Sequence, residues 1–209
     1  GEYLAEQIFP TKGNLIKMKR ALRQAQLGYE LMDRKRSILI REMVSLTDKA
    51  RELRSSIGDT YRDAYQALQR ANISMGVVSD VAKTIPVDNS LSLSTRSVMG
   101  VELPELSAQK ADMHDIPYGM LRTNSSFDQA YICFNRAKEI TVLLAETENS
   151  IYRLAISIKR TQKRANALHN IIIPKYRSYV HSISNSLEEK EREEFSRQKV
   201  IKTAKLKKA

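Results

Sequence analysis

The fold is decided by the stretch ITVLLAETENSIYRLAISIKRTQKRANALHNII, which covers residues 140–172. Apolar or small side chains recur in it at alternating steps of four and three residues, and many of the residues between them are charged. A 3.5-residue period of this length makes a narrow apolar seam, as in a left-handed coiled coil. Because so narrow a seam cannot enclose a core by itself, it requires a partner helix. The seam positions are Ile140, Leu144, Thr147, Ile151, Leu154, Ile158, Thr161, Ala165, Leu168 and Ile172.

A matching seam lies near the other end of the chain, with one charged interruption at Arg36. No proline occurs between residues 12 and 75, so one uninterrupted helix is expected there, with Thr11 as its N-cap. Near Ile57 two steps of four follow one another, which locally unwinds a supercoil. Gly28 is either a tolerated defect in this helix or a close helix–helix contact. The seam positions are Leu15, Met18, Leu22, Ala25, Tyr29, Met32, Arg36, Leu39, Met43, Leu46, Ala50, Leu53 and Ile57.

The helical pattern stops between residues 83 and 124, where Pro86, Pro104 and Pro117 interrupt it. Two short alternating runs separated by residues 94–97 predict a β-hairpin with its turn there. An isolated hairpin is marginal in water, so we expect it to rest on the helices or on a partner. Long segments of this kind are often functional, and we expect docking here, with a disordered loop as the alternative. The residues expected to carry the docking are Leu91, Leu93, Met99, Val101 and Leu103.

The second helix is expected to begin with Ser125 or Ser126 as its cap, to bend over the turn before Pro174, and to fray beyond Lys190. An extended middle segment could join two parallel helices, but compact connections favour an antiparallel pair. The predicted fold class is therefore all-α: a long antiparallel two-helix coiled coil formed by the N- and C-terminal helices, with a short β-hairpin in the middle segment. The expected divisions are residues 1–82, 83–124 and 125–209.

The formal net charge is +11, which favours an acidic partner such as nucleic acid, an anionic membrane surface or an acidic protein. Basic residues crowd the first helix and the last part of the chain, where they follow an acidic run from Glu188 to Glu194. In an antiparallel pair we expect the two basic groups to meet at one tip. The residues expected to contact a partner there are Lys12, Lys17, Lys19, Arg20, Arg23, Lys199 and Lys202.

The sequence lacks the motifs of an enzyme. It has neither a GxxxxGK[ST] phosphate loop nor a GxGxxG motif after a strand, and His114, His169 and His181 do not have the spacing of metal ligands. We therefore expect no catalytic, cofactor-binding or metal-binding residue. The only cysteine is Cys133, and no apolar run approaches the roughly 20 residues that span a bilayer. With no signal peptide at its head, the chain is expected to be cytoplasmic.

Short motifs on the two expected helices carry a family resemblance. Near the start they read Pro10-Thr11-Lys12, Lys19-Arg20, Gly28-Tyr29-Glu30-Leu31 and Lys35-Arg36, and later Arg164-Ala165-Asn166-Ala167-Leu168, Ile173-Pro174 and Leu187-Glu188-Glu189. Together these motifs resemble the D subunit of V-type and archaeal-type ATPases, which the middle segment matches only in kind. His169 stands where that family usually has an acidic residue, and Tyr29 where it often has histidine.

The resemblance implies a non-catalytic central-stalk rotor, or axle, that transmits torque between a nucleotide-hydrolysing ring and a membrane ion-translocating rotor. The implied partners are the catalytic and non-catalytic ring subunits (A and B), the F subunit and the membrane-side stalk subunit (C/d). The basic tip would face the ring, and the middle hairpin the F subunit or the stalk. The complex would hold the chain at the membrane without inserting it, and no nucleic acid is expected. The alternative is a basic coiled-coil scaffold that binds nucleic acid or an anionic membrane surface.

Overall fold

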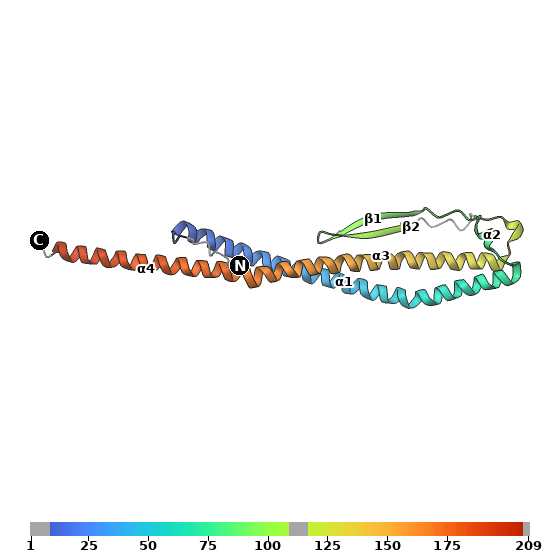
Figure 1. Ribbon diagram of the computed structural model, residues 1–209, viewed down its shortest axis with the longest axis horizontal. Coiled ribbons are helices and arrows are strands. Elements are labelled where there is room, and N and C mark those ends of the chain that lie inside the picture. Colours follow the sequence, from blue (N-terminus) through green and yellow to red (C-terminus); the bar gives the residue numbers. More distant parts are fainter. Residues whose placement is uncertain (1–8, 109–116, 207–209) are drawn as a thin grey trace, which may run out of the picture. The chain divides into compact units, whose positions relative to one another are not determined.

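The computed structural model describes residues 9–108 and 117–206. Long helices make up most of it, and two antiparallel strands that lie between α1 and α3 in the sequence form a hairpin beside α3, so the predicted fold class is confirmed (Figure 1). The elements in chain order are α1 (Lys12–Met75), α2 (Ser79–Ala82), β1 (Leu91–Val98), β2 (Val101–Ala108), η1 (Met120–Arg122), α3 (Ser125–Ala167), η2 (Leu168–Ile172) and α4 (Ile173–Leu206).

Contacts divide the chain into two compact units. Unit 1 comprises residues 1–36 and 160–209, and unit 2 comprises residues 37–159. Each unit therefore contains part of α1 together with the helix that packs on it, and unit 2 also contains the hairpin. The division of the sequence into three successive segments stays a prediction.

The helices run antiparallel in each unit. In unit 2, Arg54 contacts Glu148 and Tyr61 contacts Thr141, so the partner's number falls as the number along α1 rises. In unit 1 the same order holds, because Lys12 pairs with Glu191 and Tyr29 lies against His169. The antiparallel arrangement expected from the seams is confirmed within both units.

α1 is a single helix of 64 residues, as the lack of proline predicts. Its N-cap is Thr11, whose Oγ1 accepts a hydrogen bond from the backbone N–H of Asn14 at 3.2 Å. The helix ends at Met75, and the next residue, Gly76, has a φ of +80°. A left-handed residue just past a helix end is most often glycine, because it carries no Cβ to clash.

The core between the helices is thin. Leu39 and Leu154 face each other in the seam of unit 2 and are fully buried, with Met43, Leu46 and Ile158 packed beside them. Many of the other buried residues of the long helices, apart from Ile173 and Ile183, have small side chains, which let two helices approach closely. These are Ala25, Ala50, Ala64, Ala67, Ala71, Ala137 and Ala165, with Thr147, Ser150 and Thr161 as buried polar members.

The hairpin turn lies at Met99–Gly100 and not at the predicted residues 94–97, which belong to β1. Both turn residues have positive φ, 51° and 72°, as a two-residue type I′ turn requires. Gly100 takes this conformation without cost, and the shorter turn lengthens both strands. Pro104 lies within β2; a two-stranded sheet has only edge strands, which tolerate the missing N–H.

α3 is capped by Asn124, so the prediction of Ser125 or Ser126 as its cap was wrong. The Oδ1 of Asn124 accepts a hydrogen bond from the backbone N–H of Phe127 at 3.2 Å, and its Nδ2 donates to Ser74 Oγ at 2.8 Å. Asparagine caps as well as serine does, and here its amide group also ties the start of α3 to the end of α1.

Pro174 distorts the preceding turn, as expected, and the distortion is the π-helical turn η2. Without an N–H, and with a ring that clashes with the carbonyl four residues back, a proline disturbs regular α-helical bonding there. Beyond Lys190, where fraying is expected, α4 is helical to Leu206, and the fraying stays a prediction. Glu188–Arg192 and Glu193–Arg197 pairs one turn apart support the helix where apolar spacing is lost.

Candidate partner-binding surfaces

The hairpin has two different faces. Residues opposite one another in an antiparallel pair share a face, and the face alternates along each strand. Val98 and Val101 form one such pair, followed on the same face by Arg96 with Leu103; Leu93 and Leu106 lie on the other face. The first of these, the inner face, packs on the helices.

Hydrophobic and polar contacts hold the inner face in place. Val101 and Leu103, respectively 9% and 0% exposed, pack in one cluster with Leu39 of α1 and Leu154 of α3. Arg96 also forms an ion pair with Glu42 of α1 at 2.8 Å. Val101 and Leu103, expected to dock a partner, therefore fasten the hairpin to its own helices.

Further hydrogen bonds join β2 to α3. The backbone N–H of Leu106 donates to a carboxylate oxygen of Glu146 at 2.9 Å. Arg153 donates to the carbonyl of Glu102 at 3.1 Å. The hairpin is thus fixed along its length and not only at its core.

The other three residues of the predicted docking set are accessible. Leu91 is 47% exposed, Leu93 69% and Met99, at the turn, 45%. We call Leu91, Leu93 and the half-buried Leu106 the outer apolar face. Leucines on the solvent side of a hairpin that is already anchored are typical of a contact surface.

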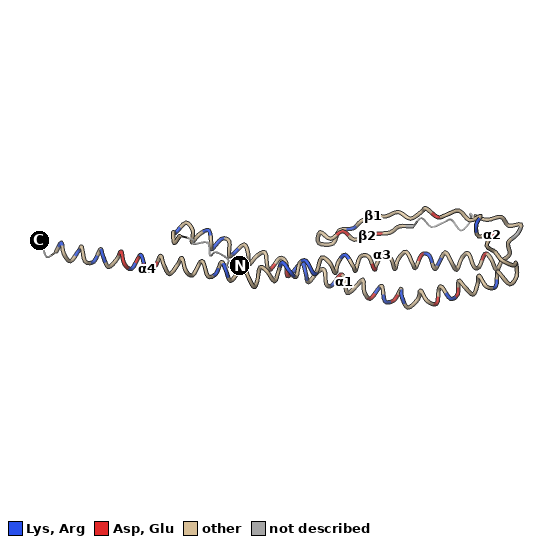
Figure 2. Tube along the Cα trace, viewed as in Figure 1, with Lys and Arg blue, Asp and Glu red and all other residues tan. Residues whose placement is uncertain are grey.

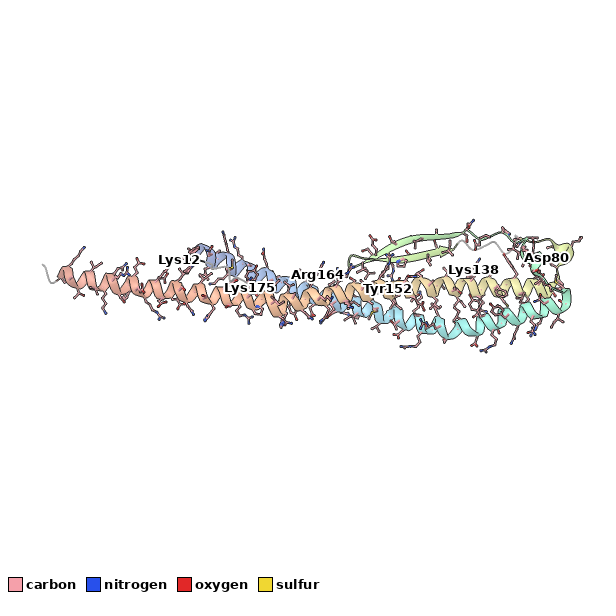
Figure 3. All side chains as sticks on the ribbon, in the orientation of Figure 1. Lys12, Asp80, Lys138, Tyr152, Arg164 and Lys175 are labelled. Atoms are coloured by element: carbon pink, nitrogen blue, oxygen red, sulfur yellow. The ribbon has the colours of Figure 1, made fainter. Side chains whose placement is uncertain are left out.

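The segment that leads into β1 is fixed by Asp88. Its carboxylate pairs with Lys138 of α3 at 2.5 Å and accepts the backbone N–H of Ser90 at 2.9 Å; Lys138 is labelled in Figure 3. The hydrogen bond from Lys138, followed by the bond from Ser90, holds the pKa of Asp88 well below its usual range. This ion pair positions the hairpin's first strand beside α3.

Tyr118 anchors the connection back into α3. It is buried in a cluster with Ala71, Val78 and Phe127, and its hydroxyl donates to Asp128 Oδ1 at 2.7 Å. Burial, strengthened by the hydrogen bond to the Asp128 carboxylate, raises the pKa of Tyr118 well above its usual value. The cluster fixes the segments that leave α1 and enter α3.

Exposed apolar side chains lie on the segments next to this anchor, and the seam pattern of the sequence did not predict them. The hydrogen bond between Asn124 and Ser74 brings the end of α1 close to the segment containing η1. Large apolar side chains on both segments face solvent. In the sequence they could have been recognised as apolar residues that do not fall on the seam positions. We call them the end patch: Ile73 at 78% exposure, Val77 at 85%, Met120 at 71% and Leu121 at 100%.

The basic groups of the two termini do not meet. Lys12, at the start of α1 and labelled in Figure 3, pairs with Glu191 of the acidic run of α4 at 3.0 Å; Figure 2 colours the acidic and basic residues along α4. At 1.5 Å per helical residue, Lys199 and Lys202 lie about 12 and 16 Å further along α4. The expectation of one shared tip was wrong because α4 stays helical past the start of α1. All seven predicted basic residues are exposed: Lys12, Lys17, Lys19, Arg20, Arg23, Lys199 and Lys202.

Tyr29 of α1 and His169 of η2 contact one another across the helix pair of unit 1. The rings of Tyr29 and His169 have centroids 5.1 Å apart. Next to them, the Cδ1 of Leu168 lies 3.7 Å from where a Cβ on Gly28 would be. Gly28 is therefore at a helix–helix contact, although one with room for a methyl group.

Metal sites and membrane spans are both missing from the described residues. No group of three or more His, Cys, Asp or Glu side chains there could hold a metal ion. In the same part of the chain, no helix is long and apolar enough to cross a membrane.

Comparison with known proteins agrees with a component of a rotary ATPase. The family model for the D subunit of ATP synthase matches residues 14–203. The chain is 42% identical over 197 residues to the D subunit of the V-type ATP synthase of Thermotoga neapolitana, and the match covers 93% of this chain and 97% of the relative. It is 34% identical over 200 residues to the D subunit of the A-type ATP synthase of Pyrococcus abyssi, with 94% of each chain covered. The chain belongs to the ATP synthase D-subunit family.

Proposed function

We propose that this chain is the central-stalk rotor, the axle that carries torque between the nucleotide-hydrolysing ring and the ion-translocating rotor in the membrane. The observation that carries the proposal is α1, a single 64-residue helix paired antiparallel within each unit. Torque requires paired helices that resist stretching and sliding. Backbone hydrogen bonds along each helix resist stretching, and an interlocked seam resists sliding.

The role is mechanical, and the chain itself is not an enzyme. ATP hydrolysis would occur in the ring of A and B subunits, and this chain would turn inside it. The exposed basic residues at the start of α1 and on α4 supply a surface for the ring. Charges exposed to solvent contribute little affinity each, so contacts of this kind can form and break during rotation.

Unit 2 supplies surfaces for the other partners. We assign the outer apolar face of the hairpin to the F subunit and the end patch to the membrane-side stalk subunit (C/d). Both surfaces are apolar, and anchored segments present them, as suits contacts that must hold while the rotor turns. The complex would place the chain at the cytoplasmic face of the membrane without inserting it.

The test is assembly with the ring subunits of the same source, followed by native mass spectrometry. One copy of the chain per ring is expected. No association, or one copy on every pair of ring subunits, would contradict the proposed axle. Either result would favour a basic coiled-coil scaffold that binds nucleic acid or an anionic membrane.

The basic surface can be tested in the same assay. Charge reversal of Lys12, Lys17, Lys19 and Arg20 together is expected to weaken assembly or slow ATP turnover by the ring. Charge reversal of the same number of exposed basic residues in unit 2, such as Arg51, is the control. Equal assembly and equal ATP turnover in the two variants would contradict a contact between the ring and the basic residues at the start of α1.

A further inference from the structure

Arg36 is a charged residue at a seam position of α1. Its side chain is only 30% exposed. One terminal nitrogen donates to Gln162 Oε1 on α3 at 2.7 Å, and the other pairs with Asp33 Oδ1 on its own helix at 2.5 Å. We call Arg36, Asp33 and Gln162 the arginine layer; it lies within unit 1.

The acceptor for Arg36 is held in place. Gln162 Nε2 donates to Asn166 Oδ1, one turn further along α3, at 3.1 Å. With its amide nitrogen committed to that bond, the amide oxygen of Gln162 faces Arg36. The cross-helix hydrogen bond therefore depends on one particular residue at one particular height on α3.

Stability does not account for this layer. The Nε of Arg36 is buried and has no hydrogen-bond partner among the described residues. Replacement of half-buried charged groups by apolar residues of similar size is often neutral or stabilising, because the charge no longer has to lose its hydration. What a polar residue in a coiled-coil seam does supply is axial alignment, since it is satisfied in one register only.

The apolar rhythm of residues 140–172 by itself discriminates poorly between registers. A slide of α3 by one heptad replaces apolar or small seam residues by others of the same kind, because the rhythm persists over residues 140–172. The same slide puts Ala155 or His169 in the place of Gln162. Neither carries an amide or carboxylate oxygen for Arg36.

We propose that the arginine layer sets the axial register of α1 against α3 in unit 1. Arg36 is a positioning residue, and Gln162 is the residue on α3 with which it must form a hydrogen bond in the observed register. The inference concerns the fold itself and holds whatever the chain's partners are.

Cross-linking in the full-length chain measures the register directly. Cys133→Ser removes the native thiol, and Gly28→Cys is combined with a second cysteine on the other helix. Leu168→Cys reports the observed register, because Leu168 contacts Gly28. Thr161→Cys and Lys175→Cys report slides of one heptad in either direction. A short bis-maleimide then joins whichever pair is adjacent.

With Arg36 present, cross-linking is expected for the Leu168→Cys pair alone. Arg36→Leu should bring one of the slid pairs to at least a tenth of the cross-linked product, with no fall in the urea midpoint of unfolding. Gln162→Leu should act in the same way, whereas Gln162→Glu, which still offers an oxygen to Arg36, should restore a single register.

Loss of stability without a slid product would overturn the proposal, because the layer would then be an ordinary stabilising contact. A single register in both leucine variants would overturn it as well. If Arg36→Leu does not fold, the two Gln162 variants decide alone, since leucine and glutamate at that position are predicted to differ.

Discussion

Truncation of Leu103 to alanine tests whether the hairpin is part of the core of unit 2. The side chain is fully buried in one cluster with Leu39 and Leu154, so its removal takes contacts from both helices at once. Deletion of three buried carbons costs their transfer free energy plus that of the cavity they leave, together about 3–5 kcal/mol for a leucine. We expect Leu103→Ala to lower the free energy of unfolding by that amount.

The matched control is Leu93→Ala on the opposite face of the same hairpin. Leu93 is 69% exposed, so only about a third of its side chain leaves water on folding. Its truncation should cost less than about 1 kcal/mol by the same area argument. The two variants delete identical atoms from one hairpin and differ only in the face from which they delete them.

Urea unfolding followed by circular dichroism at 222 nm gives the free energies, and hydrogen exchange of residues 91–108 reports the hairpin itself. For Leu103→Ala we expect a lower urea midpoint and faster exchange of both strands. If Leu93→Ala costs as much as Leu103→Ala, or if neither changes the midpoint, the hairpin does not share a core with the helices.

Three further outcomes can be measured on single variants. Gly28→Ala should stabilise the chain by up to about 1 kcal/mol, the difference in helix propensity, because Leu168 leaves room for the methyl group. Gly58→Ala, in open surroundings, should give a similar gain in thermal melts. A loss of stability in Gly28→Ala alone would contradict the distance between Leu168 and Gly28. The folded-state pKa of Asp88 is lowered, so its contribution to stability is present above the unfolded-state value near 4 and is lost as pH falls below it. Lys138→Gln should raise the pKa of Asp88 in an NMR titration. An unchanged titration would exclude the ion pair. The pKa of Tyr118 is raised in the folded state, so its contribution to stability is present below about pH 10 and is lost as pH rises further. Tyr118→Phe should lower the free energy of unfolding by about 1 kcal/mol at pH 7 and remove that loss at alkaline pH. An unchanged dependence of stability on alkaline pH in the variant would count against the buried hydroxyl.

The seams could be predicted from the sequence because a 3.5-residue period is a repeated local signal. Every seam residue from Leu15 to Ile57 and from Ile140 to Ile172 is buried or half-buried in the structure. The long proline-free segment likewise predicted one uninterrupted helix, and α1 covers it from Lys12 to Met75. Repetition makes such signals robust, since one exception such as Arg36 leaves the pattern readable.

Single-residue events could not be predicted in the same way. The turn at Met99–Gly100 and the cap at Asn124 each depend on one conformation or one hydrogen bond, and neighbouring residues with similar propensity compete for the same role. The inner and outer faces of the hairpin were also indistinguishable, because both carry leucine or valine at alternate positions. Only the position of the helices decides that Leu103 is buried and Leu93 is not.

The part of α4 beyond its pairing with α1 has a thermodynamic consequence for assembly. Residues 192–206 are all exposed, and the ion pairs of Arg192 and Arg197 lie within α4 itself, so tertiary contacts do little to reinforce the backbone hydrogen bonds of this stretch. A helix of this kind opens locally and its amides exchange quickly, because short helices in water are only marginally stable. A partner that binds this stretch must hold it in the helical state, which costs conformational entropy. That cost reduces the affinity of the first contact and leaves its specificity intact.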